Sequence, residues 1–433
     1  MEDILARAKN FAEEAEVFRA SIEQTPVVFE TNRLKQLHTQ QSTVTTLRII
    51  HHGKIGLATA AGSYDAEKLV ERAIALAEMG ITSHVEFPSR QRYPVVELYD
   101  YQVEETPVNQ MIVLGQSLID HVRFHTPELI CQAEVSKSVI SVRIINSRGG
   151  DISYRKSIFS LGMEGTLVRG EDMLFVFDSE SSCHNIKDAG KVSKTITRQL
   201  EWARNNTVVC TGRLPVIFTS LGMASVIAHP LMEAFNGKTV LQGASPLGDK
   251  QGVKVFDKKI NVTDDATVIH RPASYPSDDE GTPGQITSLV EDGVVTNFIY
   301  DLQTAGLAGT RSTGNGDRGS GGMPVPSMSN LVIAPGEVSF EDMIRDMKEG
   351  LVVEYLMGAD QGNVLGGEFS GNVLLGYKVE KGEIVGRVKD TMLSGNIYHI
   401  LKNINAIGNK QEWAGSLRTP ALLCADLAVT CKT

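Results

Sequence analysis

Residues 128–182, ELICQAEVSKSVISVRIINSRGGDISYRKSIFSLGMEGTLVRGEDMLFVFDSESS, decide the fold class of the first half of the chain. Runs rich in β-branched and aromatic residues, separated by Gly-containing turns, predict several strands joined as hairpins. The segments on either side indicate helices. Residues 106–125 place Thr106 as an N-cap and Pro107 at the first helical position. Residues 190–206 return to a helical pattern.

The same order of elements occurs earlier in the chain. Residues 3–15 have the apolar spacing of an amphipathic helix, residues 16–62 alternate as strands do, and residues 63–80 predict a second helix. Helix, strands and helix therefore follow one another twice, in 1–80 and in 106–206, which indicates an internal duplication. Two unrelated α+β segments would give the same order, and both interpretations stay open.

The second half of the chain has a different sequence pattern. After Arg213, short apolar strands alternate with Gly-rich turns, and two helical stretches interrupt them at 220–236 and 339–350. We therefore predict an α+β domain at 1–206 and a β-rich domain at 207–433. The expected fold class is α+β, with a duplicated helix–strands–helix region followed by a largely antiparallel β-rich C-terminal domain.

The composition is that of an ordinary soluble globular protein, with 42% hydrophobic and 22% charged residues among 433. A net charge of −10 argues against sequence-independent binding of nucleic acid, which needs clustered Lys and Arg. No apolar run is long enough to predict a transmembrane helix, and the acidic N-terminus lacks a signal-peptide pattern. Five scattered cysteines without a CxxC pair favour reduced thiols in a cytoplasmic protein.

The stretch SVIAHPLMEAFNGKTV, residues 225–240, contains a pair typical of metal sites. His229 and Glu233 are four residues apart and would share one face of a helix. A metal hydrolase also needs a third ligand, an open position for water and a carboxylate beside the first ligand as general base. Pro230 occupies that neighbouring position and disturbs the helix. We favour the alternative, a surface contact between the two side chains that contributes about 0.3–0.5 kcal/mol.

Two polar loops are candidates for contact with a substrate or a partner chain. The segment DDEGTPG, 278–284, offers carboxylates for a peptide amine or a cation, and glycines suited to turns. The segment GTRSTGNGDRGSGG, 309–322, offers backbone amides for an anion and a flexible cover for a substrate. A solvated acidic turn and a simple linker are the alternatives. The residues concerned are Asp278, Asp279, Glu280, Gly281, Arg311, Ser312 and Arg318.

Six stretches of the second half form an ordered set of long motifs. They are DDEGTPGQITSLVEDGVVTNFIYD at 278–301, STGNGDRG at 312–319, EDMIRDMKEGLVVEYLMG at 341–358, GGEFSGNVLLGYKVEKGEI at 366–384, LSGNIYHILKNINAIGN at 393–409 and SLRTPALL at 416–423. Together they resemble the TldD/PmbA family, whose two kinds of subunit are TldD and TldE (PmbA). The resemblance covers most of 213–430, and the first 205 residues agree with it more loosely, in element order and length.

The resemblance implies a heterodimeric zinc metallopeptidase that acts on peptides or unfolded proteins. It places the zinc in the TldD type of subunit, on a helix with His-Glu-x-x-x-His and a Cys near the C-terminus. This chain departs from that pattern at every ligand. With His229 as the first ligand, Pro230 replaces the base and Ala234 replaces the second His. With Ala228 as the first, His229 replaces the base and Glu233 the second His. The segment expected to hold the Cys, KQEWAG, has none.

The resemblance is therefore to the TldE/PmbA type of subunit, which lacks the zinc motif. We expect a non-catalytic, cytoplasmic subunit that holds no metal and pairs with a TldD-like chain bearing zinc. It would help to enclose a cavity for a peptide or unfolded substrate, without binding nucleic acid or a membrane, and alone it could form a homodimer. Two alternatives stay open. One is a self-sufficient homodimeric metallopeptidase that uses His229 and Glu233, and the other is a regulatory binding protein linked to modulation of DNA gyrase.

Overall fold

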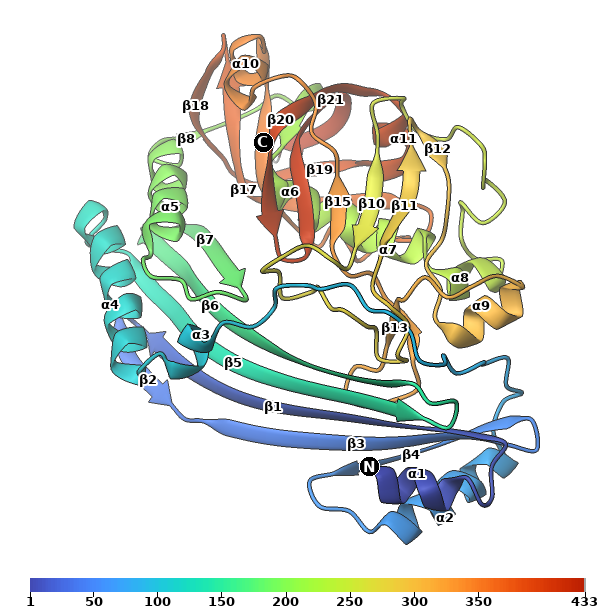
Figure 1. The fold of residues 1–433 in the computed structure, drawn as a ribbon. Helices are drawn as coiled ribbons and strands as arrows, with labels where there is room; N and C mark the ends of the chain where they lie inside the picture. Colours follow the sequence, from blue (N-terminus) through green and yellow to red (C-terminus); the bar gives the residue numbers. More distant parts are fainter. Residues whose placement is uncertain (432–433) are drawn as a thin grey trace.

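A twisted antiparallel sheet of seven strands forms the first half of the chain in the computed structural model, which describes residues 1–431 (Figure 1). Its strands are β1 (Glu14–Glu30), β2 (Arg33–Leu37), β3 (Gln40–His51), β4 (Lys54–Ala61), β5 (Ile130–Asn146), β6 (Asp151–Arg169) and β7 (Asp172–Ser182). They are ordered β4-β3-β1-β5-β6-β7, and β2 pairs with β1. The strands β1 and β5 therefore lie side by side at the centre, in register from Glu16↔Asn146 to Phe29↔Ala133.

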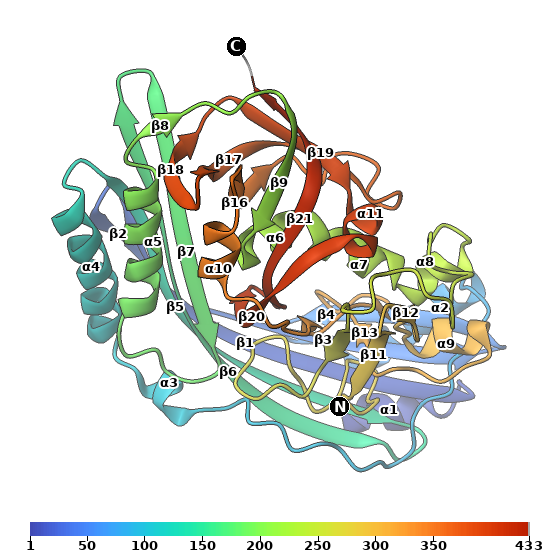
Figure 2. The ribbon, with the colours of Figure 1, turned by 90° about the horizontal axis from the view of Figure 1, so that it is seen from above.

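Helices pack at both ends of this sheet (Figure 1). They are α1 (Glu2–Ala8), α2 (Ala66–Glu78), α3 (Tyr101–Glu105), α4 (Val108–His125) and α5 (Gly190–Trp202). The helices α1 and α2 share a hydrophobic core with Val17 and Leu47, whereas α4 and α5 share another with Phe29 and Phe159. The predicted order of helix, strands and helix is thus present twice, and the two segments meet where β1 lies beside β5 (Figure 2).

The second half of the chain builds a sheet of twelve strands around its own core. The strands are β8 (Asn206–Thr207), β9 (Gly212–Phe218), β10 (Val262–Asp265), β11 (Ile286–Glu291), β12 (Val294–Val295), β15 (Leu331–Ile333), β16 (Glu349–Met357), β17 (Glu368–Glu380), β18 (Glu383–Val388), β19 (Thr391–Asn396), β20 (Ile404–Ala414) and β21 (Leu417–Cys431). A separate pair is formed by β13 (Gly316–Asp317) and β14 (Val325–Pro326). The helices are α6 (Ser220–Met223), the π-helix η1 (Ala224–Ala228), α7 (His229–Ala234), α8 (Gly237–Leu241), α9 (Leu302–Ala308), α10 (Phe340–Arg345) and α11 (Ile397–Lys402).

Five of these strands close into a ring, because β21 pairs with β9, β9 with β16, β16 with β17, β17 with β19, and β19 again with β21. Among the pairings between the named strands, three are parallel, namely β15–β21, β9–β16 and β8–β18. The others are antiparallel, so the α+β class with a largely antiparallel, β-rich second half is confirmed. The chain passes from the first sheet to the second at β8 and β9, where the sequence predicts a domain boundary.

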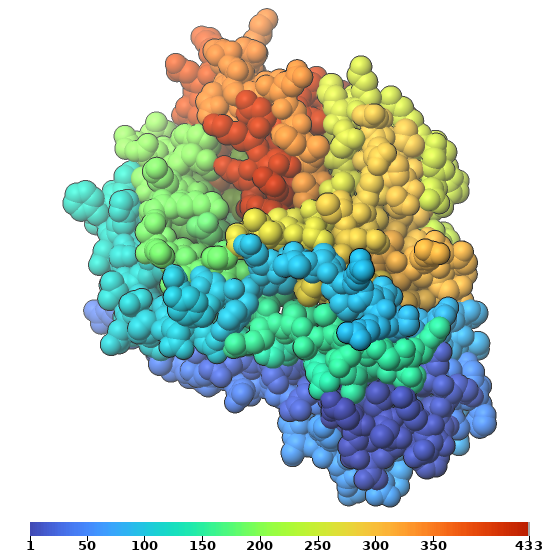
Figure 3. Space-filling model, viewed as in Figure 1, coloured from blue at the N-terminus to red at the C-terminus, as the bar shows by residue number. Residues whose placement is uncertain are grey.

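Residues 81–100, here called the strap, connect α2 to α3 without regular structure and run along the junction of the two halves (Figure 3). The strap bonds to both halves. The His84 amide donates to Oε1 of Gln303 in α9 over 2.8 Å, and Nδ2 of Asn146 in β5 donates to the Pro88 carbonyl over 2.7 Å. It therefore ties the first sheet to the loops of the second half. No helix within residues 1–431 combines the length and apolarity that crossing a bilayer requires.

Four buried charges join the first sheet to loops of the second half, and we call them the ionic cluster: Glu16, Arg48, Glu280 and Arg318. Each is at most 3% exposed. The Arg48 guanidinium donates to Glu280 over 2.6 Å and lies 3.2 Å from Glu16, which also accepts from Arg318. Two carboxylates and two guanidinium groups balance one another, which is the condition under which charges are tolerated away from water.

We expect Arg48→Met to lower the free energy of unfolding by about 3–5 kcal/mol, because it leaves buried carboxylates without their cation. Arg143→Met is the matched control, since Arg143 is 38% exposed and pairs with Glu2 and Asp151 at the surface. Its loss should cost about 1 kcal/mol or less. Urea unfolding followed by circular dichroism measures both. Equal losses for the two variants would contradict a dominant role of the ionic cluster.

Candidate functional site

The helix predicted at 220–236 is present, but it is not a uniform α-helix. It consists of α6, a π-helical segment at Ala224–Ala228, and α7, in which His229 and Pro230 form the first turn. Proline has no amide to donate to the carbonyl four residues earlier, and its ring crowds that carbonyl. A wider π turn directly before Pro230 relieves this conflict, and such turns are frequent at functional sites. The sequence pattern indicates the disturbance but not its form.

His229 and Glu233 lie on the exposed side of α7. Their nearest ring nitrogen and carboxylate oxygen are 4.0 Å apart, and the side chains are 57% and 41% exposed. Glu233 also accepts a hydrogen bond from Thr239 over 3.3 Å. Ala234 is fully buried in the hydrophobic core instead. Residues five apart on an α-helix point about 140° away from each other, so positions 229 and 234 do not share a face here.

Within residues 1–431, His229 and Glu233 are not part of a group of three side chains spaced to hold a metal. Cys424 lies in β21, where burial raises the pKa of its thiol to about 12 and disfavours the thiolate that binds metal. The predicted alternative of a surface contact describes the geometry of His229 and Glu233 well.

The acidic turn DDEGTPG is largely buried, although Asp279, Thr282 and Pro283 keep partial exposure. Asp278 and Glu280 are buried, as is Arg318 from the Gly-rich loop. The Asp278 carboxylate accepts hydrogen bonds from the amides of Glu280, Thr282 and Gly316, over 2.8–3.0 Å. The prediction that Asp278, Glu280 and Arg318 face substrate or a partner therefore needs correction for this chain: their partners are internal.

Burial controls the ionisation of this turn. It raises the pKa of Asp278 well above its ordinary value, and the neighbouring charge of Glu280 raises it further. Burial also raises the pKa of Glu280, although Arg48 opposes the effect. The pKa of Asp279 is raised to about 6 by burial, which its hydrogen bond from the Arg318 amide offsets in part. The turn thus resists carrying three negative charges at once.

The Gly-rich loop at 309–322 packs against β3 and β4 of the first sheet at one end. The Gly321 carbonyl accepts hydrogen bonds from Thr46 and Thr59, both over 2.8 Å. Gly321 has φ of +91°, and a Cβ there would lie 2.8 Å from a methyl group of Val44. A glycine is therefore required by both conformation and space.

The other end of this loop is exposed to solvent. Arg311 is exposed, and with Ser312 it lines a depression of about 550 Å³ beside the strap. Arg148 of the first half and Pro283 of the acidic turn also line it. That Arg311 and Ser312 contact a substrate or partner stays a prediction. Another residue predicted for such a contact, Gly281, has φ of +78°, and its carbonyl accepts a hydrogen bond from the Tyr93 hydroxyl.

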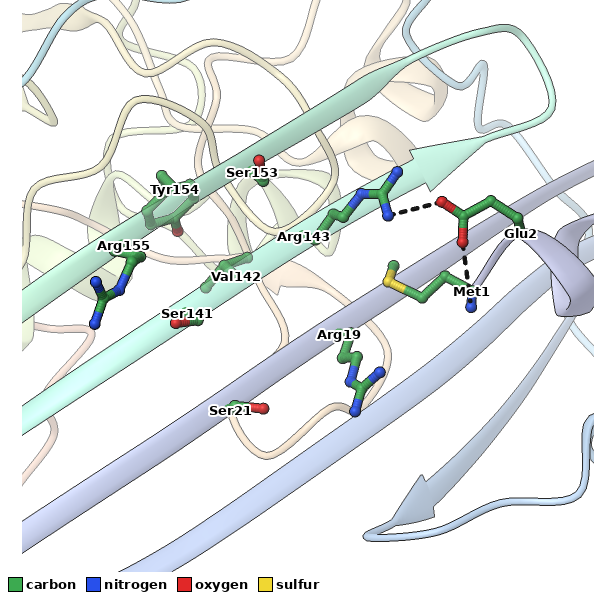
Figure 4. Close-up of a pocket in the computed structure, with 10 residues that line it drawn as sticks. All are labelled: Met1, Glu2, Arg19, Ser21, Ser141, Val142, Arg143, Ser153, Tyr154 and Arg155. Carbon is green, nitrogen blue, oxygen red and sulfur yellow. Dashed lines mark ion pairs between the residues drawn. The ribbon is translucent and has the colours of Figure 1, made fainter.

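A second depression of about 550 Å³ lies on β1, β5 and β6, near α1 (Figure 4). Arg19, Arg143 and Arg155 come from these three strands, and Figure 4 shows the ion pair of Arg143 with Glu2. Arg155 is paired with Glu104 over 2.9 Å. Sequence reasoning misses this group because its members are far apart in the chain, and the strand pairing that joins them has no local signal.

Two family models match the chain. The model of the PmbA/TldA metallopeptidase C-terminal domain matches residues 211–431, and that of PmbA/TldA metallopeptidase domain 1 matches residues 15–77. The chain therefore belongs to the PmbA/TldD family, whose members include proteins named as metalloproteases. The first match contains the helix with His229 and both polar loops, and the second contains Glu16 and Arg48.

Individual relatives support the same assignment. The chain is 28% identical over 390 residues to an uncharacterised protein of Methanocaldococcus jannaschii, covering 87% of each chain. It is 36% identical over 188 residues to a metalloprotease of the same organism, covering 43% of this chain and 41% of that protein. The solved structure of TldE from Thermococcus kodakarensis superposes with a TM-score of 0.90 over 99% of both chains, at 24% identity. That likeness concerns the fold.

The raised pKa of Asp279 gives a prediction for stability against pH. The unfolded chain releases this proton near the ordinary value of 3.8 and the folded chain at about 6. Between these values only the unfolded state is ionised, so the stability contributed by Asp279 is present below about pH 4 and is lost as pH rises through about 6. Asp279→Asn cannot ionise and should gain up to about 3 kcal/mol relative to the unmodified chain across this interval.

Urea unfolding at a series of pH values measures this difference. Asp249→Asn is the control, because Lys250 lowers the pKa of the exposed Asp249, and its difference curve should run the opposite way. A flat curve for Asp279→Asn would contradict the prediction, because it would show that folding does not shift the pKa of Asp279.

Proposed function

We propose that this chain is the non-catalytic subunit of a metallopeptidase of the PmbA/TldD type. It pairs with a TldD-like chain that carries the zinc, and it contributes walls to a cavity for a peptide or unfolded substrate. The observation that carries the proposal is the state of the helix in 220–234. It keeps its place in the core, but its only candidate ligands within residues 1–431, His229 and Glu233, have no third partner.

The chemistry of this helix supports the proposal. A hydrolytic zinc needs three protein ligands and a water, with a base that can take the proton of that water. Pro230 has no group that accepts a proton. Ala234 is buried in the core, on a different face of the helix from His229, so a side chain there could not bind the same ion. The surrounding apolar residues, among them Ile227 and Leu231, are those of a packed structural helix.

The cavity contribution rests on the exposed end of the Gly-rich loop. Arg311 and Ser312 lie in the depression beside the strap, where a backbone could pass between the acidic turn and the first half. The exposed guanidinium of Arg311 suits a peptide carboxylate or a main-chain carbonyl. In this proposal Asp278, Glu280 and Arg318 hold the loop in position from the interior and do not touch the substrate.

We expect the purified chain to leave unfolded casein intact, and the complex with a coexpressed TldD-like chain to cleave it. His229→Ala and Glu233→Ala in this chain should leave the rate of the complex within about twofold, because neither group takes part in the reaction. Disruption of the His-Glu-x-x-x-His helix in the TldD-like chain should abolish cleavage. Affinity capture of a tag on either chain, followed by cleavage of labelled casein, provides the measurements.

A different outcome would favour the self-sufficient enzyme. If the chain alone cleaves casein, chelators stop the reaction, and His229→Ala abolishes it, the proposal is wrong. Arg311→Ala tests the cavity separately. It should raise KM for casein in the complex with little change in kcat, since it removes ground-state and transition-state binding equally. Failure of the two chains to copurify would contradict the pairing whatever the rates.

A further inference from the structure

Three side chains far from α7 converge where the strap crosses the two halves. Glu97 lies in the strap, His184 follows β7, and His270 lies in the loop after β10. One ligand atom from each lies within 4.8 Å of those of the other two. Within residues 1–431, this is the group whose composition and spacing suit a metal ion. Sequence reasoning misses it, because single histidines 86 positions apart carry no spacing signal.

The backbone holds these residues in place. The His270 amide donates to the Glu97 carbonyl over 2.9 Å, and the His270 carbonyl accepts from the Cys183 amide over 2.9 Å. His270 is thus fixed between the strap and the end of β7. Its φ of +61° lies in the left-handed region, where residues other than glycine are uncommon. This conformation places its ring against that of His184, with 3.8 Å between centroids and an angle of 76°.

The two rings differ in the surroundings of their nitrogens. Nδ1 of His184 lies 3.4 Å from the Asp100 carboxylate. This is the arrangement in which a carboxylate fixes the orientation of a metal-binding imidazole and leaves Nε2 as the ligand. Nε2 of His270 lies 3.5 Å from the Glu97 carboxylate, and its Nδ1 is buried without a hydrogen-bond partner among the described residues. One ligand atom of each of the three residues thus remains available at the place where they converge.

We propose that Glu97, His184 and His270 bind a divalent transition-metal ion of the zinc type, with Asp100 as a positioning residue. Two imidazoles and one carboxylate form a donor set known for zinc, with water in the fourth position. Tetrahedral ligands at about 2.0–2.1 Å from the ion lie about 3.3 Å apart. The present spacing of up to 4.8 Å requires a shift of about 1 Å, which the side chains have room to make because Glu97 and His184 are 69% and 46% exposed.

This site differs in kind from a catalytic centre. It joins three segments, from the strap, the first sheet and the second half, so a bound ion would fasten the strap to both halves. An ion that binds the folded chain and not the unfolded one raises stability by mass action. The site also departs from the expectation that this chain holds no metal and that zinc lies in a partner subunit.

Zinc titration of the metal-stripped full chain by calorimetry tests the proposal. We expect one zinc ion per chain, and a weakening of at least about 100-fold for His184→Gln and for His270→Asn. Asparagine is chosen at 270 because it tolerates the left-handed conformation. Asp100→Asn should weaken binding about 10–100-fold without removing a ligand. His229→Ala should leave both the stoichiometry and the affinity unchanged.

Cobalt in place of zinc gives an independent readout. The unmodified chain should show the visible absorption of tetrahedral Co²⁺ ligated by nitrogen and oxygen, and His270→Asn should lose it while keeping the circular dichroism of the folded chain. Glu97→Gln is a surface substitution that keeps the test open if a histidine variant fails to fold. The proposal would be overturned if the unmodified chain bound no zinc. It would also be overturned if His184→Gln, His270→Asn and Glu97→Gln all bound zinc as tightly as the unmodified chain. Loss of zinc in His229→Ala alone would assign the metal to α7 instead.

Discussion

The pairing of Arg48 with Glu16 and Glu280 is the constraint on which the arrangement of the two halves depends. A charge buried at this depth is stable only when its partners are in place, so β1 and β3 of the first sheet and the acidic turn of the second half must meet in one geometry. Burial by itself lowers the pKa of Arg48, but the two carboxylates reverse the effect and raise it. Arg318 brings the Gly-rich loop to the same cluster. Two loops that look free in the sequence are thereby fixed from within.

Short-range sequence patterns predict much of this fold, because each pattern reflects interactions within one helix or one hairpin. The alternation in 128–182 identifies the β5–β7 hairpins, and the apolar spacing of 63–80 identifies α2, since each pattern acts within one element. The doubled order of helix, strands and helix follows in the same way. The ring closed by β19 and β21 has no such signal, because strand partners are chosen by contacts across the whole chain. The burial of Asp278 and Glu280 is missed for the same reason: their cation, Arg48, lies more than 200 residues away.

In the proposed function, the helix with His229 is a structural element and carries no catalytic group. Its position in the core is maintained by apolar residues such as Ile227 and Leu231, whose packing does not depend on a metal. The exposed face is then free to change, and Pro230 and the π turn before it are compatible with packing although they are incompatible with a general base. The sequence predicts this loss of the base and of the second ligand, and it stays a prediction. The sequence gives no indication of the contact between His184 and His270. That contact depends on the left-handed backbone of His270 and on three segments that lie far apart in the sequence.

The strand β21 follows in the sequence every strand with which it pairs, and this determines when the second sheet can form. Its neighbour β9 is made roughly 200 residues earlier, which is roughly 10–40 s of synthesis at about 5–20 residues per second. Throughout that time the apolar residues Ile217 and Phe218 lack the partner that covers them in the finished protein. The first sheet is complete much sooner, since β7 ends at Ser182. All strands of the first sheet are therefore made while β9 still lacks its partner β21, and this leaves chaperones a defined apolar segment to bind.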